Sequence, residues 1–328
     1  MGYSLDPALP VTHSVRQVAL SELDSARSWL TDPDIHTGIH NARKSLKRLR
    51  SLLRLIESGV PEPLFDHLRA RLRDIGKELA PARDAQALME TLEKLGRKSP
   101  KLTDGDMYGQ MRTWLEGRLG RLGANGTDPV AKAVEDLDRL RPTFAKLSVF
   151  PDDFETLREG AIKEYRAARE AFREAYKDKS DEAFHEWRKH VQRHWRQLQL
   201  LTPCWPETLG ARAEHVHTLA KMLGDDHDLA NLHQLATAPA MTFGGTGETD
   251  KLAKRCRKDQ KALRAEAKAL GARLFADKPK TFAARIEARW RDAAEAAQTS
   301  LQSGPESERE TNNVVFFESG RDGETKTG

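Results

Sequence analysis

Two pairs of segments repeat along the chain at a nearly constant distance, and this repetition limits the folds open to the sequence. The segment HNARKSLKRLR begins at His40 and HEWRKHVQRHW begins at His185, so that His, Arg and Lys coincide at an offset of 145 residues. A second pair, GKELAPARD ending at Asp84 and AKMLGDDHD ending at Asp228, coincides at an offset of 144. Matched segments at one offset imply matched structural units. We therefore predict an internally duplicated fold.

The composition and the residues expected at helix ends predict an all-α fold. Hydrophobic residues make up 38% of the chain, charged residues 32% and aromatic residues 6%, which is typical of amphipathic helices. Capping residues and clusters of Gly, Pro, Ser and Asp separate six predicted helices in each half. The first six are expected over about 12–30, 34–58, 62–80, 82–95, 106–122 and 129–146. The second six are expected over about 151–177, 181–202, 206–223, 226–237, 249–274 and 279–299.

The same reading divides the chain into a first repeat over 5–148, a second repeat over 149–300 and a tail over 301–328. The tail is rich in Ser, Glu, Gly and Thr, and its one apolar island, residues 314–317, is too short to build a core. We predict that it is disordered. The stretch 242–250 is expected to be a flexible helix connection, because it lacks the lysine and the preceding strand of a phosphate-binding loop.

The charge and the cysteines favour a cytoplasmic protein. The formal net charge is +4, which is too mild to demand a polyanionic partner by itself. The first ten residues do not resemble a secretory signal, and no stretch is apolar enough to suggest a membrane-spanning helix. The two cysteines, Cys204 and Cys256, are far apart and lack metal-ligand spacing, as expected of unpaired thiols in a reducing compartment.

The helix predicted over 34–58 separates its cations from its apolar residues. Between Ile35 and Ile56 there are six Lys or Arg residues and no acid, although like charges four residues apart repel. At 100° per residue, one side carries His40, Arg43, Lys44, Lys47, Ser51 and Arg54, and the other carries Ala42, Leu46, Leu49, Leu53 and Ile56. An ordinary solvated face would mix signs, so this face is a candidate site for an anion.

Its counterpart in the second half is basic but weaker. It carries His185, Arg188, Lys189, Arg193 and Arg196 in the same sense, with Gln192 in place of Lys47 and one acid, Glu186. Arg48 coincides with Arg193 in the aligned segments. The next helix adds Arg69, Arg73 and Lys77 at four-residue spacing, and its repeat offers His217 and Lys221.

The remaining candidates have structural explanations beside functional ones. His40 and His185 either contact a ligand or are packed and hydrogen-bonded. Asp84 and Asp228 lie in the first turn of predicted helices, where a carboxylate complements the helix dipole, or they orient a nearby Arg or Lys.

These motifs resemble the CHAD domains, the conserved histidine α-helical domains, over about residues 5–300. The resemblance rests on the two His-x-x-Arg-Lys helices and on the LAPARDAQ and LGDDHDLA turns that follow them. It implies two helical bundles related by a pseudo-twofold axis, with basic residues of both halves lining a central cradle for inorganic polyphosphate. Family members are associated with polyphosphate granules, and some are fused to a triphosphatase domain whose Glu-x-Glu-x-Lys motif is absent from this sequence.

We therefore predict a non-catalytic polyphosphate-binding protein with no cofactor and no metal, located in the cytoplasm and at polyphosphate granules. The predicted binding residues are His40, Arg43, Lys44, Lys47, Arg48, Arg54, Arg73, Lys77, His185, Arg188, Lys189, Arg193, Arg196 and Lys221, and the supporting residues are Asp84, His227 and Asp228.

Two other functions stay open at this point. A basic cradle also attracts the phosphate backbone of nucleic acids, although no base-stacking aromatic residue interleaves with the basic stripe of the first half, whereas Trp187 and Trp195 accompany the second. A metal-dependent phosphohydrolase built from His40, His185, His227, Asp84 and Asp228 is the other alternative. Against it, the cations would repel a divalent metal, and the pairs His36/His40 and His190/His194 lack the intervening Glu of a helical zinc-hydrolase motif.

Overall fold

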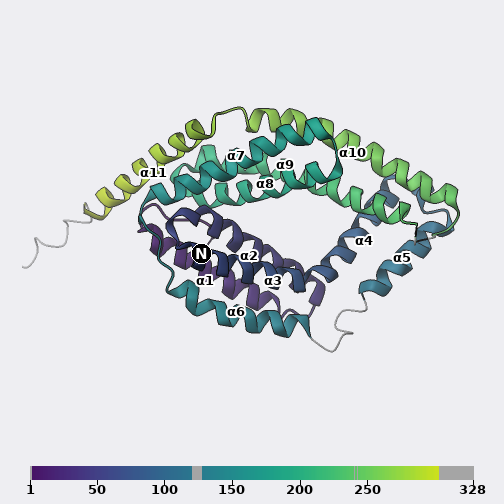
Figure 1. Cartoon of the computed structure of the whole chain (residues 1–328), viewed down its shortest axis with the longest axis horizontal. Helices are drawn as coiled ribbons and strands as arrows, with labels where there is room; N and C mark the ends of the chain where they lie inside the picture. Colours follow the sequence, from purple (N-terminus) through teal and green to yellow (C-terminus); the bar gives the residue numbers. More distant parts are fainter. Residues whose placement is uncertain (1, 120–127, 240, 242, 303–328) are drawn as a thin grey trace, which may run out of the picture.

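Helices account for the fold of this protein. The computed structural model describes residues 2–119, 128–239, 241 and 243–302, and in these residues it contains eleven α-helices and no strand (Figure 1). The helices of the first half are α1 (Val11–Trp29), α2 (Ile35–Leu55), α3 (Glu62–Glu78), α4 (Ala80–Lys98), α5 (Asp106–Leu119) and α6 (Pro129–Ala145). Those of the second half are α7 (Phe154–Asp178), α8 (Asp181–Leu201), α9 (Pro206–Thr237), α10 (Thr246–Leu274) and α11 (Pro279–Gln302). The predicted all-α class is confirmed.

The first half contains the six predicted helices, and local sequence explains their ends. The carboxylate of Asp34 caps α2 by accepting hydrogen bonds from the backbone N–H groups of His36 and Thr37 at 3.0 and 3.3 Å. Such a cap satisfies N–H groups that have no partner within the helix. Short 3₁₀ turns follow α2 and α4, at Glu57–Gly59 and Pro100–Leu102.

The second half has five helices where six were predicted, because α9 continues through the expected break near residue 224. Gly224 lies inside this helix, and a Cβ atom there would meet only Arg188 Nε, at 3.9 Å. The first half does break at the matching place, where Pro81 lies in the first turn of α4. Proline has no N–H to donate and its ring crowds the preceding turn. The prediction overlooked that the second half has no proline there.

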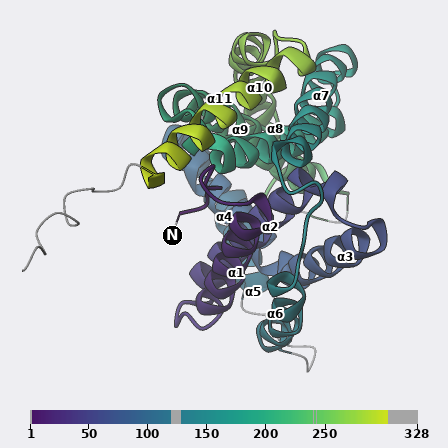
Figure 2. The ribbon, with the colours of Figure 1, turned by 90° about the vertical axis from the view of Figure 1, so that its left-hand side faces the viewer.

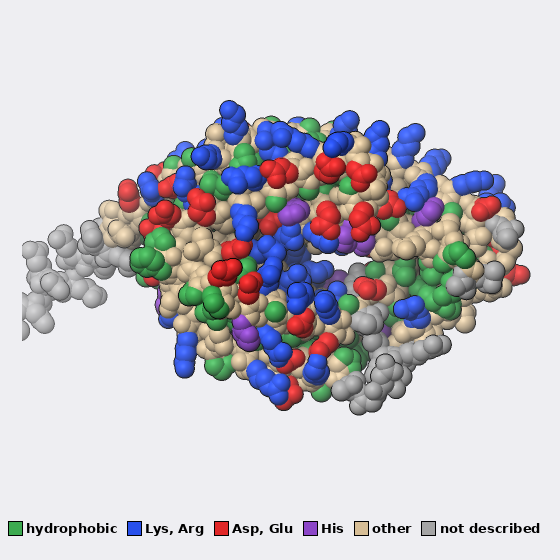
Figure 3. All heavy atoms as spheres, in the orientation of Figure 1, with side chains coloured by type: hydrophobic (Ala, Val, Ile, Leu, Met, Phe, Trp, Pro, Cys, Tyr) green, Lys and Arg blue, Asp and Glu red, His purple; other side chains and the backbone are tan. Residues whose placement is uncertain are grey.

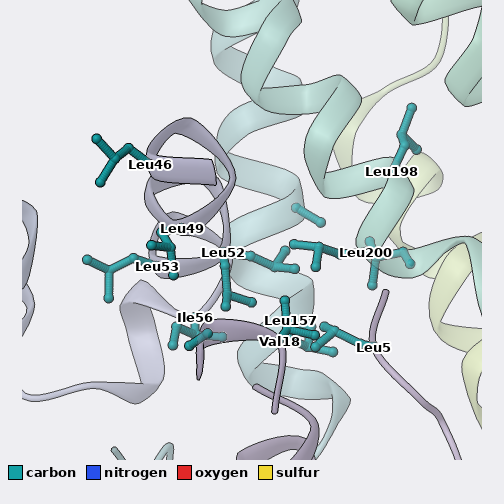
Figure 4. Close-up of a cluster of buried hydrophobic side chains, with 14 of the residues drawn as sticks. Leu5, Val18, Leu46, Leu49, Leu52, Leu53, Ile56, Leu157, Leu198 and Leu200 are labelled. Atoms are coloured by element: carbon teal, nitrogen blue, oxygen red, sulfur yellow. The ribbon is translucent and has the colours of Figure 1, made fainter. Parts of the chain in front are cut away.

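The larger hydrophobic core joins both halves of the sequence. Leu49 and Leu53 of α2, and Ile56 directly after it, pack in one buried cluster with Leu157 of α7 and Leu200 of α8 (Figure 4). Helices α2 and α8 contact each other directly. The predicted boundary at 148/149 therefore separates the helices along the chain but does not separate them in packing. That the halves are copies of one unit stays a prediction.

A second, smaller core lies at the other end of the molecule and is also shared between the halves. It is formed by α4, α5, the C-terminal part of α9 and α10, and includes Leu92, Met111, Leu232, Leu252 and Cys256. Figure 1 shows α4 and α5 reaching away from α1, α2 and α3 toward α10, and Figure 2 shows the helices α7 to α11 lying above α1, α3 and α6. The two cores are thus linked by the long helix α9 and by the α3–α4 junction.

Two remaining predictions concern the connection before α10 and the tail. Helix α10 already begins at Thr246, inside the stretch predicted as a flexible connection. Before it, Gly244 has a φ of +60° and donates its N–H to Oε1 of Gln110 at 2.8 Å, and residue 242 is outside the described residues. Helix α11 includes residues 301 and 302 of the predicted tail, and 303–328 lie outside the described part. Among the described helices, none is long and apolar enough to cross a bilayer.

Candidate functional site

A cavity of about 850 Å³ lies between the helices that carry the repeated motifs. Figure 3 shows this hollow near the middle of one face, with Lys and Arg side chains gathered at its edge. Its lining from α2 and α8 consists of His40, Arg43, Lys44, Lys47, Arg50, Ser51, Arg54, His185, Arg188, Lys189, Gln192, Arg193 and Arg196. The lining from α4, α5, α9 and the residues after α9 consists of Asp84, Ala85, Ala87, Leu88, Trp114, Arg118, His227, Asp228, Asn231, Gln234, Leu235, Ala238 and Met241.

The lining concentrates positive charge far beyond the average of the chain. It contains ten Lys or Arg side chains and two carboxylates, which is a net charge of +8 with neutral histidines. Because the whole chain carries +4, all the residues outside the lining must together carry −4. A concave surface of one sign focuses the electrostatic field and attracts the opposite charge.

On the α2 side, contacts at the base of the basic face hold its side chains in place. The guanidinium of Arg43 donates a hydrogen bond to the backbone carbonyl of Gly76 in α3. Lys44 Nζ donates to Oδ1 of Asn41 at 3.1 Å and is otherwise exposed. The opposite side of α2 is buried as predicted, with Ala42, Leu46 and Leu49 at most 2% exposed.

Mutual repulsion contributes to the lowered pKa values of two arginines near the end of α2. Partial removal from water, followed by the charges of Arg54 and Arg193, lowers the pKa of Arg50. Partial removal from water and the charge of Arg193 likewise lower the pKa of Arg54. Both groups remain charged at neutral pH, since arginine starts from a pKa above 12. The arginines of α2 and α8 are therefore close enough to disfavour each other's charge.

On the α8 side, a buried glutamate of α7 holds the arginine at the centre of the wall. Both carboxylate oxygens of Glu164 accept hydrogen bonds from Nε of Arg193 at 3.0 Å, and Oε1 lies 2.6 Å from Nδ1 of His190. Burial alone would raise the pKa of Glu164, but the hydrogen bond with His190 and the charge of Arg193 lower it. Glu164 is thus an ionised anchor for Arg193.

Arg196 is the most deeply buried arginine of the lining, with 8% of its surface exposed. Its Nη1 donates to the backbone carbonyl of Gln192 at 2.8 Å, and its guanidinium lies 5.2 Å from the ring centre of Trp195. Burial lowers the pKa of Arg196 to about 10, to which neighbouring Arg48 and Arg188 contribute. A desolvated cation of this kind interacts strongly with an anion that enters the cavity.

Two histidines face each other across the α8–α9 contact. Nδ1 of His185 lies 3.1 Å from Nδ1 of His227, and Nδ2 of Asn231 donates to Nε2 of His227 at 3.2 Å. Burial and the nearby Arg188 lower the pKa of His227 to about 3. Burial and the charge of Lys189 also lower the pKa of His185. Both rings are neutral at pH 7, with the Nδ1 proton of His227 donated to His185.

Thirteen of the seventeen predicted site residues line this cavity. They are His40, Arg43, Lys44, Lys47, Arg54, Asp84, His185, Arg188, Lys189, Arg193, Arg196, His227 and Asp228. Both His-x-x-Arg-Lys motifs therefore face one space, from helices that are adjacent in the fold. Gln192, in the place of Lys47 in the second motif, lines the cavity as well.

Arg48, Arg73, Lys77 and Lys221 are not among the residues that line the cavity, and their contact with a ligand stays a prediction. Arg48 follows Lys47 by 100° around α2, and this rotation turns it to Glu22 of α1, whose Oε1 lies 3.2 Å from its Nη1. Its guanidinium also lies 5.3 Å from the ring centre of Tyr3. Nε of Arg73 lies 3.3 Å from Oδ1 of Asp74 on the surface of α3.

The two repeated aspartates line the cavity, but the predicted helix-dipole role is wrong for Asp228. Asp228 lies in the interior of α9, because that helix does not break before it. Asp84 is the fifth residue of α4 rather than the third, because the helix begins two residues earlier than predicted. Both carboxylates oppose the cation rows from the α4 and α9 sides of the cavity.

Several lining residues were missed by the sequence analysis. Arg50 carried a usable signal, since the helical period places it only 20° from Arg43 on α2. Trp114, Arg118, Asn231 and Gln234 carried none, because the repeat does not include α5 or the end of α9. Only the packing of the second core brings these side chains to the cavity.

The arrangement of His, Cys, Asp and Glu bears on the phosphohydrolase alternative. Within the described residues, no group of three or more such side chains has the geometry to hold a metal ion. His194, one of the paired histidines considered as ligands, is 1% exposed and packs edge-on against Tyr165. Burial lowers the pKa of His194 to about 3, so this histidine is a neutral core residue.

Comparison with known proteins places this geometry in a family. The model of the family described as CHAD domain matches residues 17–237, which is more than half of the chain. The fold is similar to that of PptA from Streptomyces chartreusis, with a TM-score of 0.57 and 14% identity over 82% of this chain and 100% of that chain. It is also similar to the CHAD domain from the plant Ricinus communis, with a TM-score of 0.50 and 15% identity over 92% of this chain and 95% of that one. No curated protein matches the sequence.

Proposed function

This chain belongs to the CHAD domain family, and from that premise we propose that it binds inorganic polyphosphate, without catalysing a reaction, in the cavity between α2 and α8. The observation that carries the proposal is the excess of cations in the lining, ten Lys or Arg side chains against two carboxylates. The proposed cellular consequence is attachment of the protein to polyphosphate granules. Polyphosphate binding by this chain would also agree with what its sequence resemblance implies.

The chemistry of the ligand fits a row of cations better than a shaped pocket. Polyphosphate is a flexible chain with about one negative charge per phosphate unit. Arg presents forked donors to phosphate oxygens, and Lys presents a compact charge. The cations from Arg43 to Arg54 extend over about 16 Å of helix at 1.5 Å per residue. Such a row can follow several consecutive phosphates, and the α8 row contacts the same thread from the other side.

The electrostatics of the cavity lining favour the binding of a polyanion. The pKa values of Arg50, Arg54 and Arg196 are lowered, in each case first by loss of solvent and then by neighbouring cations. A phosphate chain offsets both costs, because it supplies acceptors and opposite charge in place of water and repulsion. It also releases the counterions condensed on the free polyanion.

The proposal contains no chemical step, since binding at this site needs only charge and hydrogen bonds. The imidazole rings of His185 and His227 are directed at each other, with their Nδ1 atoms 3.1 Å apart. The role of these two histidines in the proposal is to adjust the positive charge of the α8 side of the cavity.

The test compares two double charge reversals with the same change in net charge. Lys44→Glu/Lys189→Glu alters one lysine on each wall of the cavity, the exposed Lys44 and the half-buried Lys189. Lys251→Glu/Lys254→Glu alters two exposed lysines of α10 that do not line it. Isothermal titration with long-chain polyphosphate is expected to show at least about a tenfold loss of affinity for the first variant. The second is expected to lose much less, since its charges are distant from the ligand and screened by salt.

Circular dichroism of both variants would establish that the helices remain intact. Equal losses in the two variants would mean that polyphosphate responds only to total charge, and the cavity would then not be the site. No measurable binding by the unaltered protein would overturn the proposed function.

A further inference from the structure

The lining of the cavity is divided into a charged side and an apolar side. Helices α2 and α8 supply nine of the ten Lys and Arg side chains and no hydrophobic side chain. Helices α4, α5 and the end of α9, with the residues after it, supply every hydrophobic lining residue and one cation, Arg118. The hydrophobic lining residues are Ala85, Ala87, Leu88, Trp114, Leu235, Ala238 and Met241. A ligand that is charged along its whole length, such as an inorganic phosphate chain, would make no use of the apolar side.

Trp114 is the largest group on the apolar side, and the second core holds it in place. Its ring contacts the ring of Phe243 edge-on, with centres 5.9 Å apart and planes at 75°. The guanidinium of Arg118, one helical turn further along α5, lies 4.9 Å from the centre of the indole. Leu88, Leu235 and Met241 pack around the same core and remain partly exposed. Trp114 and Arg118 thus form a flat, half-exposed platform inside a basic cavity.

Two amide side chains, Asn231 and Gln234, also line the cavity. Asn231 donates to His227 through Nδ2, which leaves its Oδ1 as an acceptor, and Gln234 is exposed on the same helix. Amide side chains can offer a donor and an acceptor side by side, the pattern that the edge of a nucleobase requires. Inorganic phosphate chains have acceptor oxygens only and cannot use an amide acceptor.

We infer that this cavity binds nucleoside polyphosphates, with the base stacked on the Trp114–Arg118 platform and the phosphates along the cations of α2 and α8. The inference rests on the proposed function, because the same cations hold the phosphates in both cases. Stacking of a base on an aromatic ring, with a cation–π contribution from Arg, is sequence-tolerant and favourable. The cavity volume of about 850 Å³ lies in the usual range of small-ligand sites, roughly 300–1,000 Å³.

The test uses two ligands with equal numbers of phosphates, ATP and inorganic tripolyphosphate, in buffer without divalent cations. Tripolyphosphate carries more negative charge at neutral pH than ATP, so electrostatics alone predicts that it binds more tightly. A contribution from the base reverses this order. We expect ATP to bind at least about fivefold more tightly than tripolyphosphate in isothermal titration, the lower limit for one base stacked on an aromatic residue.

Substitutions then assign the preference to the platform. Trp114→Leu is expected to abolish the preference for ATP and to leave the affinity for tripolyphosphate unchanged within about twofold. Trp114→Phe keeps an aromatic face and is expected to retain most of the preference, which keeps the test valid if the leucine variant is poorly folded. Trp29→Leu removes an exposed tryptophan of α1 that does not line the cavity and is expected to bind both ligands as the unaltered protein does.

Long-chain polyphosphate should displace ATP, as one shared cavity requires. If long-chain polyphosphate binds and ATP binds no more tightly than tripolyphosphate, the inference is wrong and the proposed function survives. If Trp114→Leu weakens both ligands equally, Trp114 is structural and the inference is again wrong. Tighter binding of single-stranded RNA than of ATP at equal nucleotide concentration would assign the platform to nucleic acid and overturn the inference. If none of the phosphate chains binds, the proposed function itself fails.

Discussion

The Nδ1 atoms of His185 and His227 lie 3.1 Å apart, within hydrogen-bonding distance, at the base of a cavity wall that carries Arg188 and Lys189. A hydrogen bond of this kind needs one donor and one acceptor, so at least one of the two rings has an unprotonated Nδ1. Burial and the adjacent cations lower the pKa of both rings below 6.5, that of His227 to about 3. A positive wall therefore contains a pair of neutral histidines that can take up one proton when an anion approaches.

The first prediction concerns pH. A bound polyanion favours the charged form of a histidine and raises its pKa, so affinity for polyphosphate should rise as the pH falls from about 8 to 6. One proton taken up by the His185/His227 pair limits the contribution of that pair to at most about tenfold per pH unit. His227 starts too low to titrate in this window, and the variant His40→Gln/His185→Gln should therefore bind with little pH dependence. Titration calorimetry at three pH values checks this, with His13→Gln of α1 as a control, and equal slopes in all three proteins would contradict it.

The second prediction concerns salt. The logarithm of the binding constant should fall linearly with the logarithm of salt concentration, because phosphate neutralisation releases counterions. Removing one cation that contacts the ligand should reduce the slope by about 0.7, the value for single strands. We expect this smaller slope for Arg50→Gln, because neighbouring arginines of the cavity lower the pKa of Arg50. We expect an unchanged slope for Lys258→Gln, which alters the exposed face of α10. An unchanged slope for Arg50→Gln would place that side chain outside the contact.

The third prediction concerns the anchor of Arg193. Glu164→Gln removes a carboxylate that is 4% exposed and paired with Arg193 and His190, leaving a partly buried guanidinium without its counter-charge. We expect a loss of about 3–5 kcal/mol in the free energy of unfolding at pH 7. Glu159→Gln, at an exposed position of the same helix, should cost less than about 0.5 kcal/mol.

The pH dependence of that difference follows from the direction of the shift. The pKa of Glu164 is below its ordinary value of 4.5, so its ionised form contributes stability above that value, and the contribution disappears as the pH falls through the folded-state pKa. The free energies of unfolding in urea of the unaltered protein and of Glu164→Gln should therefore converge as the pH falls through this lowered pKa. A gap that persists at lower pH would mean that the glutamate acts by packing rather than by charge.

The fourth prediction concerns the contact that positions α2 against α7. At Gly160 an added Cβ would lie 2.6 Å from the carbonyl carbon of Leu55, which is backbone and cannot turn away. Gly160→Ala should therefore destabilise the protein by about 1–3 kcal/mol. Gly224→Ala, at a helical position with space, should stabilise it by about 0.5–1 kcal/mol. Thermal unfolding distinguishes them, and destabilisation by Gly224→Ala would argue against a continuous α9.

The periodicity of apolar and charged residues was enough to predict most of the helices from the sequence. Ten of the helices have bounds near those predicted, and the buried and basic sides of α2 are those expected, because both depend on residues three and four apart. The repeated His-x-x-Arg-Lys segments predicted two equivalent faces, and His40 and His185 do face one cavity. The same rule could have added Arg50.

Tertiary packing decided the rest. Arg48 and Lys47 differ by a 100° rotation around α2, so that Arg48 pairs with Glu22 and Lys47 lines the cavity. The sequence of α2 alone does not show which of its cations will lie beside a buried glutamate and which beside open space. The absence of a proline let α9 run through Gly224, and the second core then brought Trp114 of α5 into a cavity built by α2 and α8. Such contacts join residues far apart along the chain. Helical periodicity relates residues within a few turns only, so it cannot predict these contacts.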